Sequence, residues 1–238
     1  RTDRDEKMNL DGKAGGVRPG AMDEVRRICR GWAGAAGRCG CAEERIDFFR
    51  GALPALLARA ELLAGVLEGI ADGRPLPDLR IATVFENEYL LHQDPAGLFS
   101  LRLYLYGPGE LTFVHDHVTW GVSGPARGRL EVVRYRRTDD GSDPGLARLE
   151  STERTTLQPG EIETTLPFER GIHRTGNPQA GTTWMVSVYG PPARRSVMHR
   201  FDLETGRVTP LRPPRVHKRL LAQQALSEQV AEKRHLEP

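Results

Sequence analysis

The stretch GELTFVHDH, residues 109–117, decides the interpretation of this chain. The run before it, residues 99–106, alternates apolar side chains with Ser, Arg and Tyr, the pattern of a β-strand with one buried face. If residues 112–119 form the next strand, His115 and His117 share a face, because side chains two apart in a strand point the same way. The pattern therefore predicts two imidazoles that can meet one metal ion.

His173, in the stretch GIHRTGN at residues 171–177, is the histidine that we expect to complete the metal site from a neighbouring strand. Imidazole suits Fe(II), Zn(II), Cu and Ni alike, so the ligand type does not choose the metal. Three neutral ligands leave a divalent ion its full charge, which favours a thiolate as the incoming group. Asp116, on the opposite face from the histidines, is expected to have a structural or supporting role.

The spacing of these residues resembles the motifs of the cupin barrel. Gly109, His115 and His117 match the first motif, and Gly128 stands where its closing glycine is expected. The glutamate of that motif is replaced by Gly121, so the usual carboxylate ligand is missing. The second motif is followed loosely by Pro167, Gly171, His173 and Asn177. The chain thus resembles a cupin that lacks the glutamate and keeps three histidines.

Several short segments indicate a resemblance to one particular group of cupins: YLLH at 89–92, GPG at 107–109, VHDHVTWG at 114–121, GIHR at 171–174 and VYG at 188–190. Together they resemble the bacterial thiol dioxygenases, the family of cysteine dioxygenase and 3-mercaptopropionate dioxygenase. The resemblance implies a mononuclear iron(II), Fe(2+), held by three histidines. It implies that the protein is an enzyme that oxidises a small thiol to its sulfinic acid with O₂.

The resemblance also implies a catalytic role for Tyr189, whose hydroxyl would position the reacting oxygen or sulfur. We expect Glu88, Arg102 and Trp120 to contact the substrate. Family members bind the substrate carboxylate with Arg or Gln at the position aligned with Glu88, or with Arg at the position of Met198. Because both clamps are absent, we expect cysteine and 3-mercaptopropionate to be poor substrates and an amine-bearing or neutral polar thiol to be better. A carboxylate could still be bound from another direction by Arg102, Arg194, Arg195 or Arg200.

Two further departures from the family concern Tyr189. A Ser-x-His-x-Tyr relay in many members reads Met185, Ser187 and Tyr189 here, so the relay is lost or shortened. Animal-type enzymes link the tyrosine covalently to a cysteine after the paired histidines. Since no cysteine follows Cys41, we expect Tyr189 to stay unmodified.

Two other functions stay open from the residues alone. A three-histidine cupin could act on a non-thiol substrate as an oxygenase, hydrolase or isomerase, and a three-histidine set is also the catalytic zinc arrangement of carbonic anhydrase. A cupin could also bind a metabolite without turnover. The remaining histidines, His92, His199 and His217, are expected to be structural or solvated.

The 238-residue chain predicts one mainly β domain, a single cupin (jelly-roll-like) barrel with an N-terminal helical cap. We expect a disordered leader at 1–20, the cap at 21–78, the barrel at 79–213 and a helical tail at 214–238. Helices are expected at 22–32 and at 48–71, the second broken near Pro54. Short strands are expected between residues 88 and 211, including single strands at 112–123 and 197–211.

The composition of the chain indicates which binding partners and which cellular compartment to expect. Lys and Arg number 34 against 32 Asp and Glu, a net charge of +2, so no global field favours nucleic acid. The apolar helix at 48–71 is too charged to span a membrane. Three cysteines without a signal peptide favour a reducing cytoplasm. We therefore expect a cytoplasmic monomer or homodimer whose partners are a small thiol and O₂.

Overall fold

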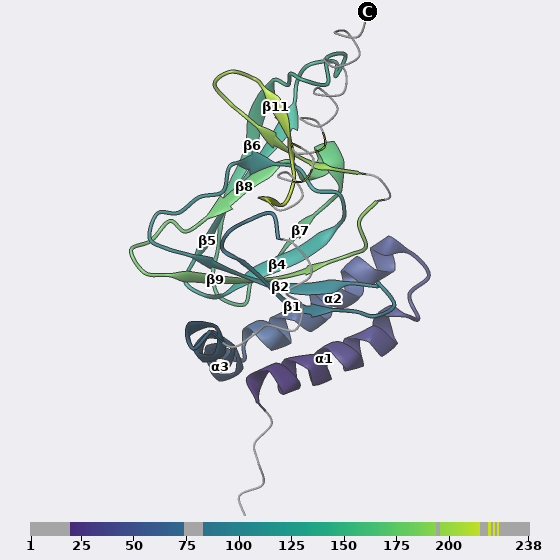
Figure 1. Cartoon of the computed structure of the whole chain (residues 1–238), viewed down its shortest axis with the longest axis vertical. Coiled ribbons are helices and arrows are strands. Elements are labelled where there is room, and N and C mark those ends of the chain that lie inside the picture. Colours follow the sequence, from purple (N-terminus) through teal and green to yellow (C-terminus); the bar gives the residue numbers. More distant parts are fainter. Residues whose placement is uncertain are drawn as a thin grey trace, which may run out of the picture.

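The structure, a computed structural model, describes residues 20–73, 83–193 and 196–214, together with 219, 221 and 223. The expected leader at 1–20 and tail at 214–238 therefore lie almost wholly outside the described residues. The helices are α1 (Ala21–Ala36), α2 (Ala42–Leu57) and α3 (Ala60–Ala71). They form the expected N-terminal helical region, and they precede the strands in the chain (Figure 1).

Two antiparallel sheets make up the rest of the described fold. The first has the order β1 (Glu88–Gln93), β2 (Ser100–Tyr106), β9 (Thr183–Tyr189), β4 (Gly121–Arg127) and β7 (Glu163–Thr165). The second has the order β11 (Val208–Leu211), β10 (Met198–Phe201), β3 (Val114–His115), β8 (His173–Gly176), β5 (Leu130–Arg137) and β6 (Leu149–Leu157). A short 3₁₀ turn, Phe168–Gly171, joins β7 to β8. This is the predicted mainly β, jelly-roll-like architecture.

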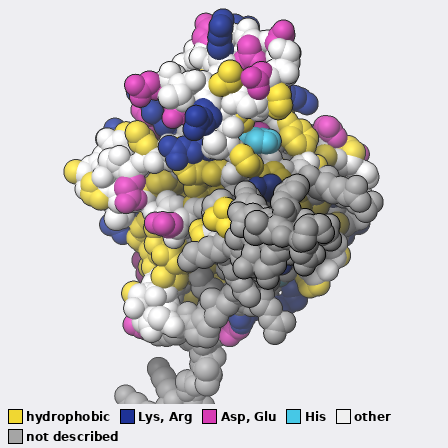
Figure 2. All heavy atoms as spheres, turned by 45° about the horizontal axis from the view of Figure 1, so that its top comes forward, with side chains coloured by type: hydrophobic (Ala, Val, Ile, Leu, Met, Phe, Trp, Pro, Cys, Tyr) yellow, Lys and Arg dark blue, Asp and Glu magenta, His cyan; other side chains and the backbone are white. Residues whose placement is uncertain are grey.

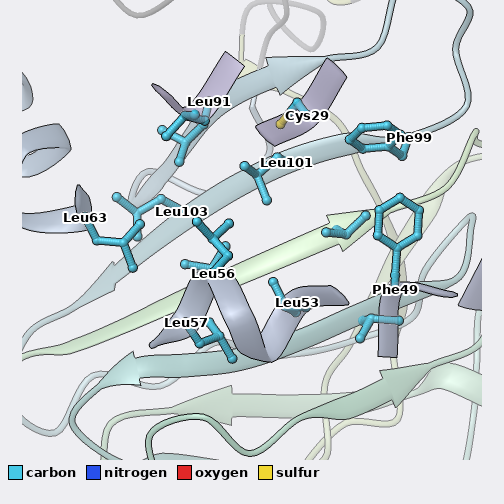
Figure 3. Packing of buried hydrophobic residues seen from close by; sticks show 14 of the residues in the cluster. Cys29, Phe49, Leu53, Leu56, Leu57, Leu63, Leu91, Phe99, Leu101 and Leu103 are labelled. Atoms are coloured by element: carbon cyan, nitrogen blue, oxygen red, sulfur yellow. The ribbon is translucent and has the colours of Figure 1, made fainter. Parts of the chain in front are cut away.

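The helices cover the outer face of the five-stranded sheet (Figure 1). Phe49 and Leu53 of α2 are fully buried against this sheet, where Leu101 and Leu103 of β2 point toward the helix (Figure 3). Fully burying a side chain of this size contributes about 1.5–3 kcal/mol. The helical layer therefore stabilises the sheet from outside and contributes no charged group to its core.

The inner faces of the sheets have a different character. On β2 the alternation expected from sequence places Leu101 and Leu103 toward the helices, so Arg102 and Tyr104 point into the barrel. Apolar residues fill one part of the interior, namely Tyr104, Tyr106, Leu130, Val132, Leu157 and Met185. Buried polar side chains fill another part, among them Glu88, His115, His117, Glu163, His173 and Ser187. Since burying polar groups costs free energy, this buried polar region is the candidate functional site.

The structure corrects three expected boundaries. Pro54 lies inside α2, and the helix is interrupted only at residues 58–59, between α2 and α3. The Ala58 N–H still donates to the Pro54 carbonyl (3.0 Å). The strand expected at 112–123 is interrupted and becomes β3 and β4, which belong to different sheets. The strand expected at 197–211 folds back on itself as the β10–β11 hairpin.

The outside of the described fold shows neither a membrane segment nor a dominant charge. No described helix has the length and apolar character needed to cross a membrane. On the face shown in Figure 2, basic and acidic side chains are interspersed, and neither sign covers a large continuous area.

Candidate metal centre and adjoining cavity

Three histidines meet inside the barrel. His115 of β3 is the antiparallel partner of His173 of β8, so their side chains share a face. His117 follows just after β3, and its Nε2 lies 2.9 Å from the Nε2 of His173. One ring nitrogen of each histidine can be chosen so that all three lie within 4.8 Å of one another. The structure thus brings together the three side chains that the sequence singled out.

The three imidazoles are buried and neutral. Burial lowers the pKa of His115 to about 4, and it lowers the pKa of His117 and of His173 well below the ordinary histidine value. Neutral imidazole is the form that binds a metal ion. The Nδ1 of His115 lies 2.9 Å from the carbonyl oxygen of Phe113, an acceptor, so Nδ1 carries the proton. The Nε2 lone pair of His115 is therefore free for a ligand.

This donor set fits a metal ion. Two nitrogens that each lie about 2.0–2.1 Å from one ion, at roughly a right angle, are about 3 Å apart. The Nε2 atoms of His117 and His173, at 2.9 Å, are already near that separation. No carboxylate belongs to the cluster among the described residues. Three histidines without an anionic ligand would leave a divalent cation its full charge.

Position 121, where the cupin motif has a glutamate, has no room for a side chain. Gly121 of β4 is paired with Tyr189 of β9, and a Cβ at position 121 would lie 2.6 Å from the Tyr189 Cε1. The Tyr189 ring occupies the space that a side chain at 121 would need. This ring stacks on His117, with centroids 5.8 Å apart and planes inclined by 20°. The phenol thus lies directly beside the histidines.

Burial raises the pKa of Tyr189, so its hydroxyl keeps its proton at neutral pH. The Tyr104 hydroxyl forms a hydrogen bond with it. Ser187, the remnant of the relay expected from sequence, is fully buried, and its side chain also interacts with the Tyr189 hydroxyl. Tyr189 thus interacts with Ser187 and with Tyr104, and the Tyr104 contact was not indicated by the sequence.

A cavity of about 110 Å³ opens beside this site. Its wall includes Val84, Phe85, Glu88, Arg102, Tyr104, His117, Val118, Thr119, Tyr189, Gly190, Pro192 and Met198. The volume is well below the roughly 300–1,000 Å³ of pockets for drug-sized ligands. The space therefore suits a molecule of only a few heavy atoms, placed between His117 and Arg102.

Glu88 and Arg102 are both in the cavity wall, but they form an ion pair with each other. The Glu88 side chain is 1% exposed and also accepts the backbone N–H groups of Val84 (3.2 Å) and Phe85 (3.3 Å). The Arg102 side chain is 23% exposed. Glu88 and Arg102, both expected to contact the substrate, thus line the same cavity, and an amine would have to compete with Arg102 for the Glu88 carboxylate. The Glu88 charge is compensated by Arg102, and the guanidinium is the more exposed member of the pair.

Trp120 is not among the described residues that line the cavity. It packs in the layer between helix α2 and the sheet, with its ring centroid 5.9 Å from that of Phe49. A Cβ at Gly190 would collide with the Trp120 ring, so the glycine leaves room for it. Our expectation of a substrate contact from Trp120 is corrected for this reason. The residue flanks the site in sequence and faces the opposite side of the sheet.

Asp116 points away from the histidines, as its place in the strand predicted. Its carboxylate accepts the backbone N–H of His199 (2.6 Å) and is 2.8 Å from the Nδ1 of the same residue. These contacts fasten β10 to β3. His92 packs against Phe99, and His217 lies outside the described residues.

Glu163 and Arg134 are residues of the site that sequence reasoning missed. Glu163 of β7 is buried, its Oε1 lies 3.8 Å from the Nδ1 of His173, and its Oε2 accepts a hydrogen bond from the Arg134 Nη2 (2.8 Å). Neither residue stands in a motif, since Glu163 begins a short Glu-Thr-Thr run and Arg134 lies in an Arg-rich strand. Only the strand order brings them to the metal-site histidines.

Comparison with known proteins gives remote structural matches and no family. No family model matches the sequence. The Cupin_2 domain of an XRE family transcriptional regulator from Enterobacter cloacae is 18% identical, with 44% of this chain and 96% of that chain covered and a TM-score of 0.33. A Cupin 2 conserved barrel domain protein from Salinispora arenicola is 21% identical, with 49% and 86% covered and a TM-score of 0.33. An oxalate decarboxylase from Lactobacillus farciminis is 18% identical, with 48% and 31% covered and a TM-score of 0.33.

Proposed function

We propose that this protein is a mononuclear iron(II) thiol dioxygenase, which converts a small thiol, R–SH, and O₂ into the sulfinic acid R–SO₂H. Both oxygen atoms end on sulfur, and no external reductant is consumed. The observation that carries the proposal is the cluster of three buried neutral histidines without a carboxylate in the donor set, beside a small cavity with a tyrosine hydroxyl. Bound iron(II) would supply the electron transfer between thiolate and O₂.

Within this proposal, the neutral donor set selects the substrate's reacting group. His115, His117 and His173 would hold the ion and leave its positive charge to attract a thiolate. Phe85, Val118 and Met198 give the cavity wall an apolar part that limits water near the sulfur. A thiol that leaves water and enters as a thiolate is thus favoured at this place over a neutral alcohol or amine.

Arg102 would bind an anionic group at the other end of the substrate. Its guanidinium faces the cavity, and its Nε lies 3.3 Å from the Ser100 hydroxyl oxygen, an acceptor. Glu88 takes one N–H, so other N–H groups of Arg102 are available for a carboxylate. The ion pair with Glu88 fixes the guanidinium. This arrangement supports a small thiol with a carboxylate or another acid group.

Tyr189 would act beside His117 as a hydrogen-bond donor. Its ring is stacked on the His117 ring, and Arg102 lies with its guanidinium carbon 5.6 Å from the centroid of the phenol ring. The hydroxyl keeps its proton because the phenol is buried. It would therefore donate to the oxygen or sulfur of the reacting groups and hold them between histidine and arginine.

The deciding experiment loads the metal-free protein with iron(II) without oxygen and then measures O₂ uptake with 3-mercaptopropionate, cysteine and cysteamine. Sulfinate formation, detected by mass spectrometry in a 1:1 ratio with the O₂ consumed, supports the proposal. The zinc-loaded protein is the control and should consume no O₂. Uptake without a thiol, or turnover without O₂, would point to a three-histidine enzyme with a different substrate. Binding of ligands without turnover would point to a metabolite-binding cupin.

A further inference from the structure

Two buried polar atoms without partners face each other behind the metal site. The Glu163 Oε1 and the His173 Nδ1 are both buried, and neither has a hydrogen-bond partner among the described residues. They lie 3.8 Å apart, slightly too far for a hydrogen bond. One is an acceptor and the other a potential donor. Unpaired buried polar groups are costly, so two complementary ones side by side call for an explanation.

Metal binding would fix the proton position on His173. Without an ion, the 2.9 Å contact between the Nε2 atoms of His117 and His173 places a proton on one of these nitrogens. An ion bound by both Nε2 atoms displaces that proton, because a metal-binding nitrogen must offer its lone pair. Neutral His173 then carries its only ring proton on Nδ1. Of the described carboxylates and carbonyls, Glu163 is the acceptor placed next to that atom.

Arg134 prepares Glu163 for this contact. Arg134 of β5 is the strand partner of His173 of β8, so both side chains are on the inner face of the same sheet. Its Nη2 donates to the Glu163 Oε2 (2.8 Å) and to the Thr164 carbonyl (3.1 Å). The second carboxylate oxygen, Oε1, is left directed to His173. Glu163 itself comes from β7 of the other sheet, so the carboxylate reaches across the barrel.

We propose that Glu163 is the positioning residue of the metal site: it accepts the Nδ1–H of His173 and fixes the tautomer that binds the ion through Nε2. Outer carboxylates of this kind orient a histidine ligand and raise its basicity. The inference rests on metal binding by the three histidines, which is part of the proposed function, and it does not depend on thiol oxidation.

The alternative is that Glu163 merely joins the two sheets through Arg134. Glu153 gives a matched control, because it also approaches Arg134 (3.6 Å), its side chain is 59% exposed, and it has no contact with His173. The full chain would be prepared as Glu163→Ala, Glu163→Gln and Glu153→Gln. The affinity for Zn²⁺ would be measured by competition with a chromophoric chelator, and thermal unfolding of the metal-free proteins would report the fold.

Removal of Glu163 should weaken Zn²⁺ binding about 10–100-fold, with Gln at the lower end because its amide oxygen still accepts a hydrogen bond. Glu153→Gln should bind Zn²⁺ as the wild type does. In the zinc-loaded wild type, ¹⁵N NMR should show the His173 proton on Nδ1. A purely structural Glu163 would lower the metal-free unfolding temperature and leave Zn²⁺ affinity unchanged.

Wild-type Zn²⁺ affinity in the Glu163 variants, or a His173 proton on Nε2 in the zinc-loaded protein, would overturn the inference. If Glu163→Ala does not fold, Glu163→Gln decides by the same two measurements. Failure of the proposed function has a different signature. An iron-loaded protein that oxidises no thiol, with Zn²⁺ affinity still dependent on Glu163, would refute thiol oxidation and leave the role of Glu163 intact.

Discussion

Replacing Arg102 with Gln should separate two classes of thiol substrate. Arg102 is the cation of the cavity wall, and its removal leaves the 1% exposed Glu88 carboxylate with only the backbone N–H groups of residues 84 and 85. A charge-assisted hydrogen bond contributes roughly 1.5–3 kcal/mol. Because about 1.4 kcal/mol is a factor of ten, kcat/KM for a carboxylate thiol should fall about tenfold to hundredfold. Activity on cysteamine, which has no carboxylate, should not fall.

The same ion pair also contributes to folding, so stability has to be measured beside activity. Removing one member of a buried ion pair costs about 3–5 kcal/mol, and the partial exposure of Arg102 places Arg102→Gln near the lower end. Glu88→Gln should lose less stability, since the Arg102 guanidinium that remains can reach water. The double variant, Arg102→Gln with Glu88→Gln, has neither charge. Its loss of stability should be smaller than the sum of the losses of the two single variants.

The assay is steady-state kinetics of sulfinate formation by the iron-loaded variants with 3-mercaptopropionate, cysteine and cysteamine, together with chemical denaturation. The ratio of kcat/KM between 3-mercaptopropionate and cysteamine cancels any uniform loss from partial unfolding or low iron. An unchanged ratio in Arg102→Gln would refute the reasoning, because Arg102 would then be only a structural partner of Glu88. Glu88→Gln should keep a preference for the carboxylate thiols, since Arg102 remains.

Three further predictions follow from single contacts. His173→Ala should lose most bound iron, as measured by metal analysis, and keep its far-UV circular dichroism; full iron content would place the site elsewhere. Gly121→Ala should force the Tyr189 ring away, since the new Cβ would lie 2.6 Å from Cε1 of the ring, about 1 Å below normal carbon contact. The variant should have a lower kcat and lose about 1–3 kcal/mol of stability. A wild-type kcat would show that the ring position is unimportant. Asp116→Asn should weaken the attachment to His199 and cost about 1–3 kcal/mol in denaturation, with iron content unchanged; iron loss would contradict its assignment to the back of the strand.

Patterns that depend on near neighbours in the sequence were predicted correctly. The alternation in residues 99–106 has a period of two, so strand β2 and its two faces follow directly from the sequence. The Gly109 and His-x-His spacing likewise indicated the barrel and the histidines that the structure brings together. Helix α1 begins within one residue of the expected start, because its apolar positions recur at helical spacing.

Features that depend on the tertiary arrangement were missed or misjudged. Glu88 and Arg102 are 14 residues apart, and their pairing depends on the antiparallel register of β1 and β2. Trp120 lies just before β4, and its direction depends on where the strand at 112–123 breaks, which the apolar pattern did not show. Glu163 reaches His173 from the other sheet, and no local pattern encodes that approach.

Strand β9 links the helical layer to the site, and this link explains how the barrel can tolerate so many buried polar groups. Val186 and Val188 are fully buried on the face toward the helices, whereas Ser187 and Tyr189 point into the barrel. Buried polar groups are costly, while apolar burial contributes about 25 cal/mol for each Å² removed from water. The continuous apolar layer on the outer face of the five-stranded sheet offsets the cost of the polar inner face. The helices therefore support the site by holding the sheet in place, without providing any of the residues that line it.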